Sequence, residues 1–301
     1  RTMNLVVLEG HMQRILDCLD QLKVAVRLPD YLPYQEGPGF YSYRVEPQPG
    51  VSVHSITGKL EVVKLALGLP ADRSIRSFVD HGAVVFEVPK DDADRYIVDA
   101  SDLMERLVDT PDTLSVPIGE DVHGDPVTID FSSSDTPHLL IAGQTGSGKS
   151  VALEVILRGL CEWKNAEQLQ LVLIDGKGTE LVDFEDSPHV LGEIGWLPED
   201  AIEVLGEAVD EMNRRYQIFK ERRAKSLSQY NAAVAESERV PWRLVVLDEY
   251  GDLTSDPDDR KQIEAFLKRI AQKGRAAGIH LIVATQKPSA EGLTTVVRAN
   301  L

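Results

Sequence analysis

The first part of the chain carries apolar residues at helical spacing. Intervals of three and four residues place such side chains on one face of a helix, so we expect residues 1 to about 27 to be helical. The stretch from Leu28 to Gly39 then concentrates proline and glycine, which interrupt regular structure. The apolar positions of the expected helix are Leu5, Val6, Leu8, Met12, Ile15, Leu16, Leu19 and Leu22.

A mixed pattern follows, in which strand-like and helix-like segments both occur. Residues 40–45 and 82–89 are rich in β-branched and aromatic side chains, which predicts strands, whereas 60–69 has the spacing of a short amphipathic helix. Residues 114–131 hold two strand-like segments around a polar turn, which predicts a hairpin. We therefore expect a small α+β module before the hairpin.

From His138 onward, short apolar runs alternate with longer helix-like segments. The runs are 139–142, 169–175, 244–247 and 281–286. Such an alternation predicts a parallel sheet that helices cover on both faces. We therefore expect an α/β domain in this part of the chain.

The charge along the chain is uneven, and it limits which partners can be expected. The 301 residues carry a formal net charge of −17, and residues 91–135 hold only Arg95 and Arg106 against 13 acidic residues. DNA-binding domains usually present a basic surface, so this balance argues against tight duplex binding by a single copy. It leaves open a ring whose inner surface alone is basic. The acidic belt is either a solvated linker and strand surface or a means of keeping DNA off an outer face.

The composition adds little beyond a cellular location. No apolar run approaches the roughly 18 residues of a membrane helix. Cys18 and Cys161 lie in unrelated contexts, which favours a reducing compartment over a disulfide framework. Residues 1–4 have neither the layout of a signal peptide nor a methionine at position 1. We expect a cytoplasmic fragment whose parent protein can be membrane-anchored through a part outside this sequence.

Residues 143–150 match the phosphate-binding pattern G-x-x-x-x-G-K-[ST]. They lie between a strand-like run and a helix-like segment, which is the context that the motif requires. Glycines let backbone amides turn toward phosphate oxygens, and the next helix adds the positive end of its dipole. Lys149 is expected to contact the β- and γ-phosphates of a nucleoside triphosphate, and Ser150 to bind Mg²⁺; a glycine-rich turn without a ligand is the alternative. The expected nucleotide-binding residues are Gly143, Gln144, Thr145, Gly146, Ser147, Gly148, Lys149 and Ser150.

Two further polar groups follow apolar runs. Asp248 and Glu249 come directly after 244–247, at the carboxyl end of an expected strand, where α/β sheets place ligands. Asp248 is expected to hold Mg²⁺, usually through water, and Glu249 to orient or deprotonate an attacking water. Gln286 is expected to sense the γ-phosphate or that water; a capped strand end is the alternative. Lys177 can reach phosphate or DNA, or be solvated.

Several segments closely resemble the FtsK/SpoIIIE family of DNA translocases. Residues 138–150 carry the resemblance at the phosphate-binding loop, and 270–289, which ends in Ala284-Thr285-Gln286-Lys287-Pro288-Ser289, is its most specific part. Residues 211–216 (Glu-Met-Asn-Arg-Arg-Tyr) are similar to the family's E-M-x-R-R-Y helix, and Tyr230-Asn231 to its Y-N pair. Upstream, Gly37-Pro38, Pro49-Gly50-Val51 and Glu87-Val88-Pro89 resemble the family's small α domain.

Pattern and resemblance together predict an α/β fold with a RecA-like P-loop NTPase core. Its sheet is expected to be mostly parallel and to be preceded by a smaller α+β domain. The expected boundaries are 1–35 for a helical segment outside the resemblance, 36–110 for the small α+β module, 111–137 for an acidic hairpin or linker, and 138–301 for a RecA-like ATPase motor domain that is incomplete at its C-terminus.

The resemblance implies a hexameric ring that uses ATP and Mg²⁺ to move double-stranded DNA. Arg275 is the candidate for an arginine that completes a neighbour's site during phosphoryl transfer; a surface arginine at a helix end is the alternative. The basic residues near 220–225 are candidates for contacts with DNA phosphates, or else the solvated face of a helix. The expected catalytic residues are Lys149, Asp248, Glu249, Gln286 and Arg275, and the DNA-binding candidates are Lys220, Arg222, Arg223 and Lys225.

Departures from the family pattern keep other functions open. Residues 175–178 (Asp-Gly-Lys-Gly) stand where the family has D-P-K, which puts the conformation of that loop in doubt. Residues 256–260 (Asp-Pro-Asp-Asp-Arg) make the turn after Glu249 unusually acidic, so family DNA contacts there need not transfer. Related ring ATPases move proteins in specialised secretion or serve conjugation and defence, and a nucleotide-bound scaffold with slow turnover is a third class. The match over 273–289 favours DNA, whereas the net acidity favours another load.

Overall fold

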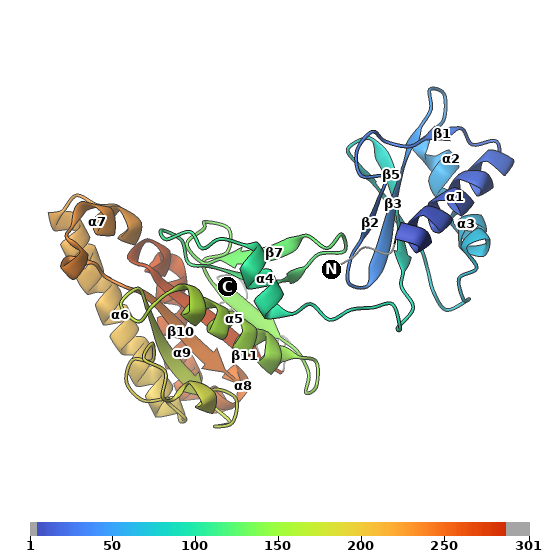
Figure 1. Cartoon of the computed structure of the whole chain (residues 1–301). Helices are drawn as coiled ribbons and strands as arrows, with labels where there is room; N and C mark the ends of the chain where they lie inside the picture. Colours follow the sequence, from blue (N-terminus) through green and yellow to red (C-terminus); the bar gives the residue numbers. More distant parts are fainter. Residues whose placement is uncertain (1–4, 287–301) are drawn as a thin grey trace. The chain divides into compact units, whose positions relative to one another are not determined.

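The computed structural model describes residues 5–286, which form two compact units (Figure 1). The first unit contains the residues up to 103 together with 119–127, and the second contains 104–118 and the residues from 128 onward. Residues 1–4 of the expected helix and Lys287-Pro288-Ser289 of the family-like segment lie outside the described range.

The first unit packs helices against an antiparallel sheet. The strand order is β1-β3-β5-β4, and β2 also pairs with β3. The strands are β1 (Val26–Arg27), β2 (Tyr34–Glu36), β3 (Phe40–Pro47), β4 (Arg76–Asp80) and β5 (Ala83–Pro89). The helices are α1 (Leu5–Gln21), α2 (Val53–Thr57), α3 (Leu60–Leu67) and, at the boundary with the second unit, α4 (Ala100–Arg106).

Helix α1 is an integral part of this first unit. Leu8, Met12, Ile15 and Leu19 are buried in one cluster with side chains of β3 and β5, whereas Val6 is 83% exposed. An amphipathic helix gains most of its stability from packing its apolar face, and the sheet supplies the partner. The expected boundary at residue 35 therefore cuts through a compact unit.

The predicted hairpin forms from β6 (Ser115–Glu120) and β7 (Pro126–Asp130). Its tip, 119–127, belongs to the first unit, where a Cβ on Gly37 would lie 2.0 Å from the carbonyl oxygen of Val122. Val116 and Phe131, near its base, are buried in the core of the second unit. The compact units thus divide the chain differently from the expected boundaries at 110 and 137, because the hairpin is packed at both ends.

The second unit is built on a parallel sheet of order β8-β11-β10-β9. Thr285 of β11 lies opposite Ala142 of β8, and Asp248 of β10 opposite Asp175 of β9, so the four strands end at the same edge. This confirms the predicted P-loop α/β fold. The strands are β8 (Leu139–Ala142), β9 (Leu169–Asp175), β10 (Trp242–Asp248) and β11 (Ile279–Thr285).

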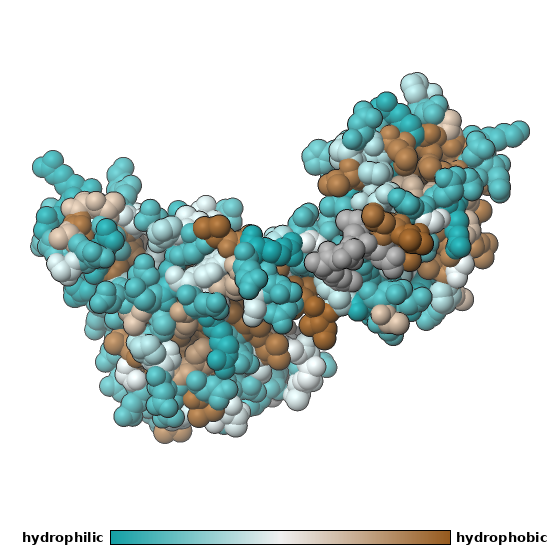
Figure 2. All heavy atoms as spheres, viewed as in Figure 1, coloured by the Kyte–Doolittle hydropathy of each residue, from teal (hydrophilic) through white to brown (hydrophobic). Residues whose placement is uncertain are grey.

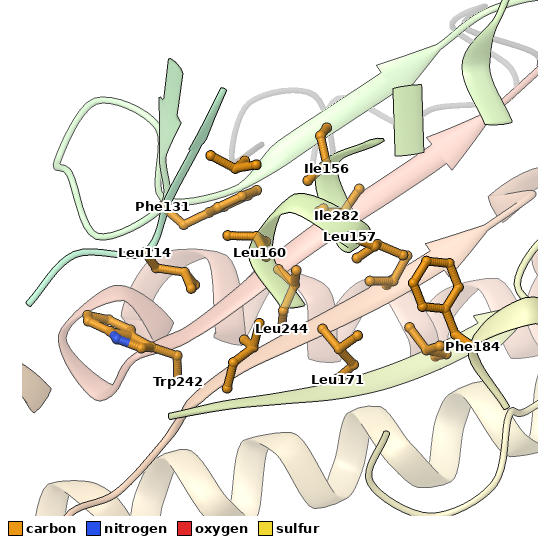
Figure 3. Packing of buried hydrophobic residues seen from close by; sticks show 14 of the residues in the cluster. Leu114, Phe131, Ile156, Leu157, Leu160, Leu171, Phe184, Trp242, Leu244 and Ile282 are labelled. Atoms are coloured by element: carbon orange, nitrogen blue, oxygen red, sulfur yellow. The ribbon is translucent and has the colours of Figure 1, made fainter. Parts of the chain in front are cut away.

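Helices cover both faces of this sheet. Leu244 of β10 packs with Leu157 and Leu160 of the first long helix (Figure 3), whereas Val245 and Leu247 belong to the cluster on the other face. The alternation follows from the two-residue period of a strand. The helices are α5 (Lys149–Trp163) on one face, α6 (Pro198–Glu221) and α9 (Pro257–Ala277) on the other, and the short α7 (Leu227–Ala233) and α8 (Tyr250–Leu253) with the 3₁₀ turns at Val182–Phe184 and Glu236–Glu238.

Hydrophilic residues cover most of the face that Figure 2 shows, with smaller hydrophobic areas between them. Over residues 5–286, none of the helices is both long and apolar enough to span a membrane.

Two buried histidines join β8 and β11 to α9, and both are held neutral. His138 Nδ1 accepts a hydrogen bond from the Leu281 amide (3.1 Å), and His280 Nδ1 donates to the Pro137 carbonyl (2.8 Å). His280 Nε2 has no partner within the described part of the chain. Burial lowers the pKa of His138 to about 4 and that of His280 to about 3.

We expect the second unit to lose stability on mild acidification. Between pH 6.5 and about 4 the unfolded chain binds protons at these histidines and the folded chain does not, so the free energy of unfolding falls as the pH is lowered, by about 1.4 kcal/mol per pH unit for each histidine. Urea unfolding followed by tryptophan fluorescence measures it, because Trp163, Trp196 and Trp242 all lie in this unit. His280→Gln should flatten the dependence; an unchanged slope would refute the assignment.

Candidate functional site

The candidate site lies at the edge where the four parallel strands end. The loop after β8, Gln286 after β11, Glu249 after β10 and the loop after β9 meet there, because neighbouring parallel strands end in register. The structure thus brings together the predicted phosphate loop, the acidic pair and the candidate sensor residue.

The phosphate loop needs glycine at three positions. Gly146 and Gly148 have φ of 80° and 92°, a region that side chains disfavour. A Cβ on Gly143 would lie 2.2 Å from Ser147 Oγ, so a side chain there would displace the loop. Gly148 is the N-cap of α5, and the first amides of that helix therefore point into the loop. This geometry suits an anionic ligand.

A pocket of about 270 Å³ opens beside the loop. Lys149, Ser150 and Gln286 line it as predicted, and Thr145 donates a hydrogen bond to Gln286 Oε1 (3.1 Å), which ties the loop to the end of β11. Glu180 also lines the pocket, and no motif in the sequence indicated it. The complete lining is Gln144, Thr145, Gly146, Gly148, Lys149, Ser150, Val151, Glu180 and Gln286.

Lys149 and Asp248 form a buried ion pair. Lys149 Nζ donates to Asp248 Oδ1, and their side chains are 5% and 1% exposed. Burial raises the pKa of Asp248, and the bond from Lys149 opposes that shift. The other oxygen, Asp248 Oδ2, is buried and has no hydrogen-bond partner among the described residues. A buried carboxylate oxygen left unpaired is costly, so a ligand for it is expected.

The residues present fit a magnesium ion shared with phosphate. Within residues 5–286 there is no group of three His, Cys, Asp or Glu side chains that could hold a metal by themselves. Mg²⁺ at phosphoryl-transfer sites uses one or two protein oxygens, with phosphates and waters supplying the rest. The free oxygen of Asp248 and the hydroxyl of Ser150 are such donors.

Glu249 is held by two partners in an uncommon backbone conformation. Its φ is 55°, and its residue exposure is 4%. Lys177 Nζ lies 3.1 Å from Glu249 Oε2, and the backbone amide of Gln286 donates to Glu249 Oε1 (3.3 Å). Burial opposes the charge on Lys177, but Glu249 and the nearby acids raise its pKa overall. Lys177 thus pairs with the candidate catalytic carboxylate, a contact that was not among the alternatives expected from the sequence.

The loop after β9 is ordered by Asp175. Its carboxylate is buried and accepts hydrogen bonds from four backbone amides at 2.8–3.1 Å. The donors are Lys177, Gly178, Glu180 and Leu181. The same turn holds Lys177 beside Glu249 and Glu180 at the pocket. The conformation of the Asp-Gly-Lys-Gly loop is thus fixed by the carboxylate of Asp175.

Arg275 lies at the opposite edge of the sheet. It is in the last turn of α9, just before β11 begins, whereas Gln286 follows the end of β11, roughly 20 Å away at the usual rise of a strand. Arg275 is exposed and lines a second pocket of about 560 Å³ together with Lys225 and Lys273. It therefore cannot reach the phosphate loop of its own chain.

One of the four DNA-binding candidates, Lys225, lines that second pocket. Lys220, Arg222, Arg223 and Lys225 are all exposed at the end of α6 and in the turn before α7. Arg222 pairs with Glu238 at 3.2 Å, and Lys225 lines the pocket beside Arg275. The acidic turn at 256–260 contains the N-cap of α9, because Asp256 accepts a hydrogen bond from the backbone amide of Asp258 (2.8 Å).

Known proteins share both the sequence and the fold. A model of the FtsK/SpoIIIE family matches residues 101–290. The DNA translocase SftA of Bacillus subtilis (strain 168) is 35% identical over 274 residues, which cover 88% of this chain and 28% of SftA. The chain thus spans less than a third of the length of that curated relative.

Solved structures give the same picture of the fold. The pCW3 conjugation coupling protein TcpA, in a monomer form with ATPγS, has a TM-score of 0.61 at 23% identity and covers 97% of this chain and 81% of its own. The cytoplasmic domain of the type VII secretion ATPase EccC of Thermomonospora curvata has a TM-score of 0.56 at 29% identity, over 68% of this chain and 25% of its own.

Proposed function

Because this chain belongs to the FtsK/SpoIIIE family, we propose that it is the motor part of an ATP-driven double-stranded DNA translocase. The observation that carries the proposal is the joint position of Lys149, Asp248, Glu249 and Gln286 at one edge of the sheet. The similar protein SftA is a DNA translocase, which supports DNA as the substrate that this motor moves.

The residues divide the chemistry of ATP hydrolysis among them. Lys149 leaves Asp248 for the β- and γ-phosphates, while the amides of the loop bind the phosphate oxygens. Asp248 Oδ2 and Ser150 would hold Mg²⁺, which would supply positive charge beside the phosphates. Glu249 orients the attacking water. Gln286 is hydrogen-bonded to Thr145 and Glu249, so its position can respond to the γ-phosphate.

Arg275 acts on a nucleotide held by another copy. It lies at the edge of the sheet opposite to its own phosphate loop and is exposed, with no ion pair among residues 5–286. An arginine supplied by a neighbour stabilises charge in the transition state of phosphoryl transfer. A hexameric ring is the assembly that we propose, because it gives every site such a neighbour.

The load is tested by measuring the ATPase rate of the full-length protein with and without long linear duplex DNA. We expect strong stimulation, and turnover without any stimulation would favour another load. Protein translocation is the second candidate, because the secretion ATPase EccC is 29% identical over most of this chain. Absence of turnover would leave only a nucleotide-bound scaffold.

We expect charge reversal of the exposed basic residues to weaken the coupling to DNA. Phosphate contacts give affinity without sequence preference, and losing about three of them should reduce the salt dependence accordingly. The variant is Lys220→Glu combined with Arg222→Glu and Arg223→Glu, and the measurement is DNA-stimulated ATPase between 50 and 200 mM salt. Lys268→Glu, on exposed α9 surface, is the control. Stimulation equal to that of the parent protein would exclude this cluster from the DNA contact.

A further inference from the structure

One segment of the family-like sequence has no part in the proposed chemistry. Residues 211–216 lie on α6, which packs along α9 (Figure 1). Two of their side chains, those of Arg215 and Tyr216, bind backbone carbonyls at the C-terminal end of α9, near Arg275.

Two side chains of α6 bind backbone carbonyls of α9 on either side of Arg275. The Tyr216 hydroxyl donates to the carbonyl of Lys273 (2.6 Å). Arg215 Nη1 donates to the carbonyl of Ala277 (2.9 Å) and lies 3.4 Å from that of Gly278. The carbonyls of Ala277 and Gly278 lie at the end of α9, where they lack helical partners, whereas the carbonyl of Lys273 lies one turn earlier in the helix.

Glu211 fixes Arg215 in this position. Arg215 Nε donates to Glu211 Oε1 (2.8 Å), and the arginine side chain is fully buried. Burial lowers the pKa of Arg215 to about 10, against the opposing effect of Glu211. A buried ion pair contributes little net stability compared with apolar side chains of similar size. What this one supplies is a fixed geometry for the carbonyls that it binds.

The backbone on both sides of Arg275 is closely packed as well. A Cβ on Gly274 would lie 2.3 Å from the carbonyl oxygen of Ile279, and Gly278, with φ of 69°, donates its amide to the Arg275 carbonyl (3.0 Å). The Arg275 side chain itself stays exposed. An exposed cationic side chain is thus attached to a closely packed backbone.

We propose that Glu211, Arg215 and Tyr216 form a brace that fixes the last turn of α9 and so positions Arg275 for the nucleotide of another copy. The inference rests on the proposed function of Arg275. Catalytic groups must be held to within a fraction of an ångström, and small displacements lower turnover strongly. The brace residues are positioning residues, since they act on Arg275 through the backbone of α9.

Tyr216→Phe removes one hydroxyl of the brace and keeps the ring. We expect kcat to fall roughly tenfold or more in the full-length protein, with KM for ATP within about twofold. Asn213→Ala is the control and should keep the parent kcat, because Asn213 is an exposed residue of the same helix and has no hydrogen bond to Glu211 or α9 among residues 5–286. The tryptophan-detected unfolding midpoint shows that both variants fold. Equal kcat in Tyr216→Phe and the parent protein would overturn the brace.

Mixing subunits separates the brace from a general structural defect. After subunit exchange, Tyr216→Phe copies keep a sound phosphate site, and Glu249→Gln copies keep a sound Arg275. We expect the mixture to turn over ATP several-fold faster than the average of the two variants alone.

A reference mixture keeps the two levels of the proposal apart. Arg275→Ala copies mixed with Glu249→Gln copies should recover in the same way. Recovery there without recovery for Tyr216→Phe would overturn the brace and leave the function of Arg275 standing. Recovery in neither mixture would overturn the action of Arg275 on a neighbouring copy, on which the brace depends.

Discussion

Arg275→Ala should lower the ATPase rate of the full-length protein by about a thousandfold or more, because an arginine supplied in trans contributes that much to phosphoryl transfer. ATP affinity should stay within a few-fold, since Arg275 is remote from the phosphate loop of its own chain. Steady-state turnover and equilibrium binding of an ATP analogue measure the two effects separately.

The matched control is Arg269→Ala, another exposed arginine of α9 that does not line the pocket beside Arg275. Its turnover should equal that of the parent protein. Unchanged turnover in Arg275→Ala would remove this residue from catalysis, and a parallel loss of ATP affinity would place it in binding.

Lys149→Ala should abolish measurable turnover and also destabilise the second unit. ATP affinity should fall about tenfold to a hundredfold, because charge-assisted hydrogen bonds to phosphate are lost. Removing one member of a buried ion pair leaves Asp248 without its partner, which costs about 3 kcal/mol. Urea unfolding followed by tryptophan fluorescence measures the loss of stability.

The double variant Lys149→Ala/Asp248→Asn tests the cause of that loss. Replacing the isolated carboxylate by a neutral amide should restore most of the stability and none of the ATPase activity. If Lys149→Ala alone unfolds at the same urea concentration as the parent protein, the buried pair has no role in stability.

The features that were predictable from sequence are those that neighbouring residues encode. The phosphate loop is one contiguous segment in which glycine is required by local steric constraints. The four apolar runs, separated by helix-like segments, predict a parallel sheet. The acidic pair was predictable because carboxylates after a buried strand reach the ligand edge of the sheet.

The features that were not predictable depend on contacts across the fold. The contact of Lys177 with Glu249 joins the ends of β9 and β10. The hydrogen bonds to the Asp175 carboxylate come from backbone amides, whose positions no side-chain pattern indicates. Glu180 lines the pocket from the same loop, where its amide donates to Asp175. The packing of α1 was missed because periodicity identifies an apolar face but not its partner.

The placement of Arg275 and the phosphate loop at opposite edges of one sheet has a consequence for how activity scales. Under the proposed function, a single copy holds the residues that bind ATP but lacks the arginine needed for fast hydrolysis. If Arg275 acts in trans, the rate per molecule should rise steeply with protein concentration and level off once assembly is complete. Hydrolysis would then begin only where copies have assembled, and isolated chains would remain bound to ATP without hydrolysing it.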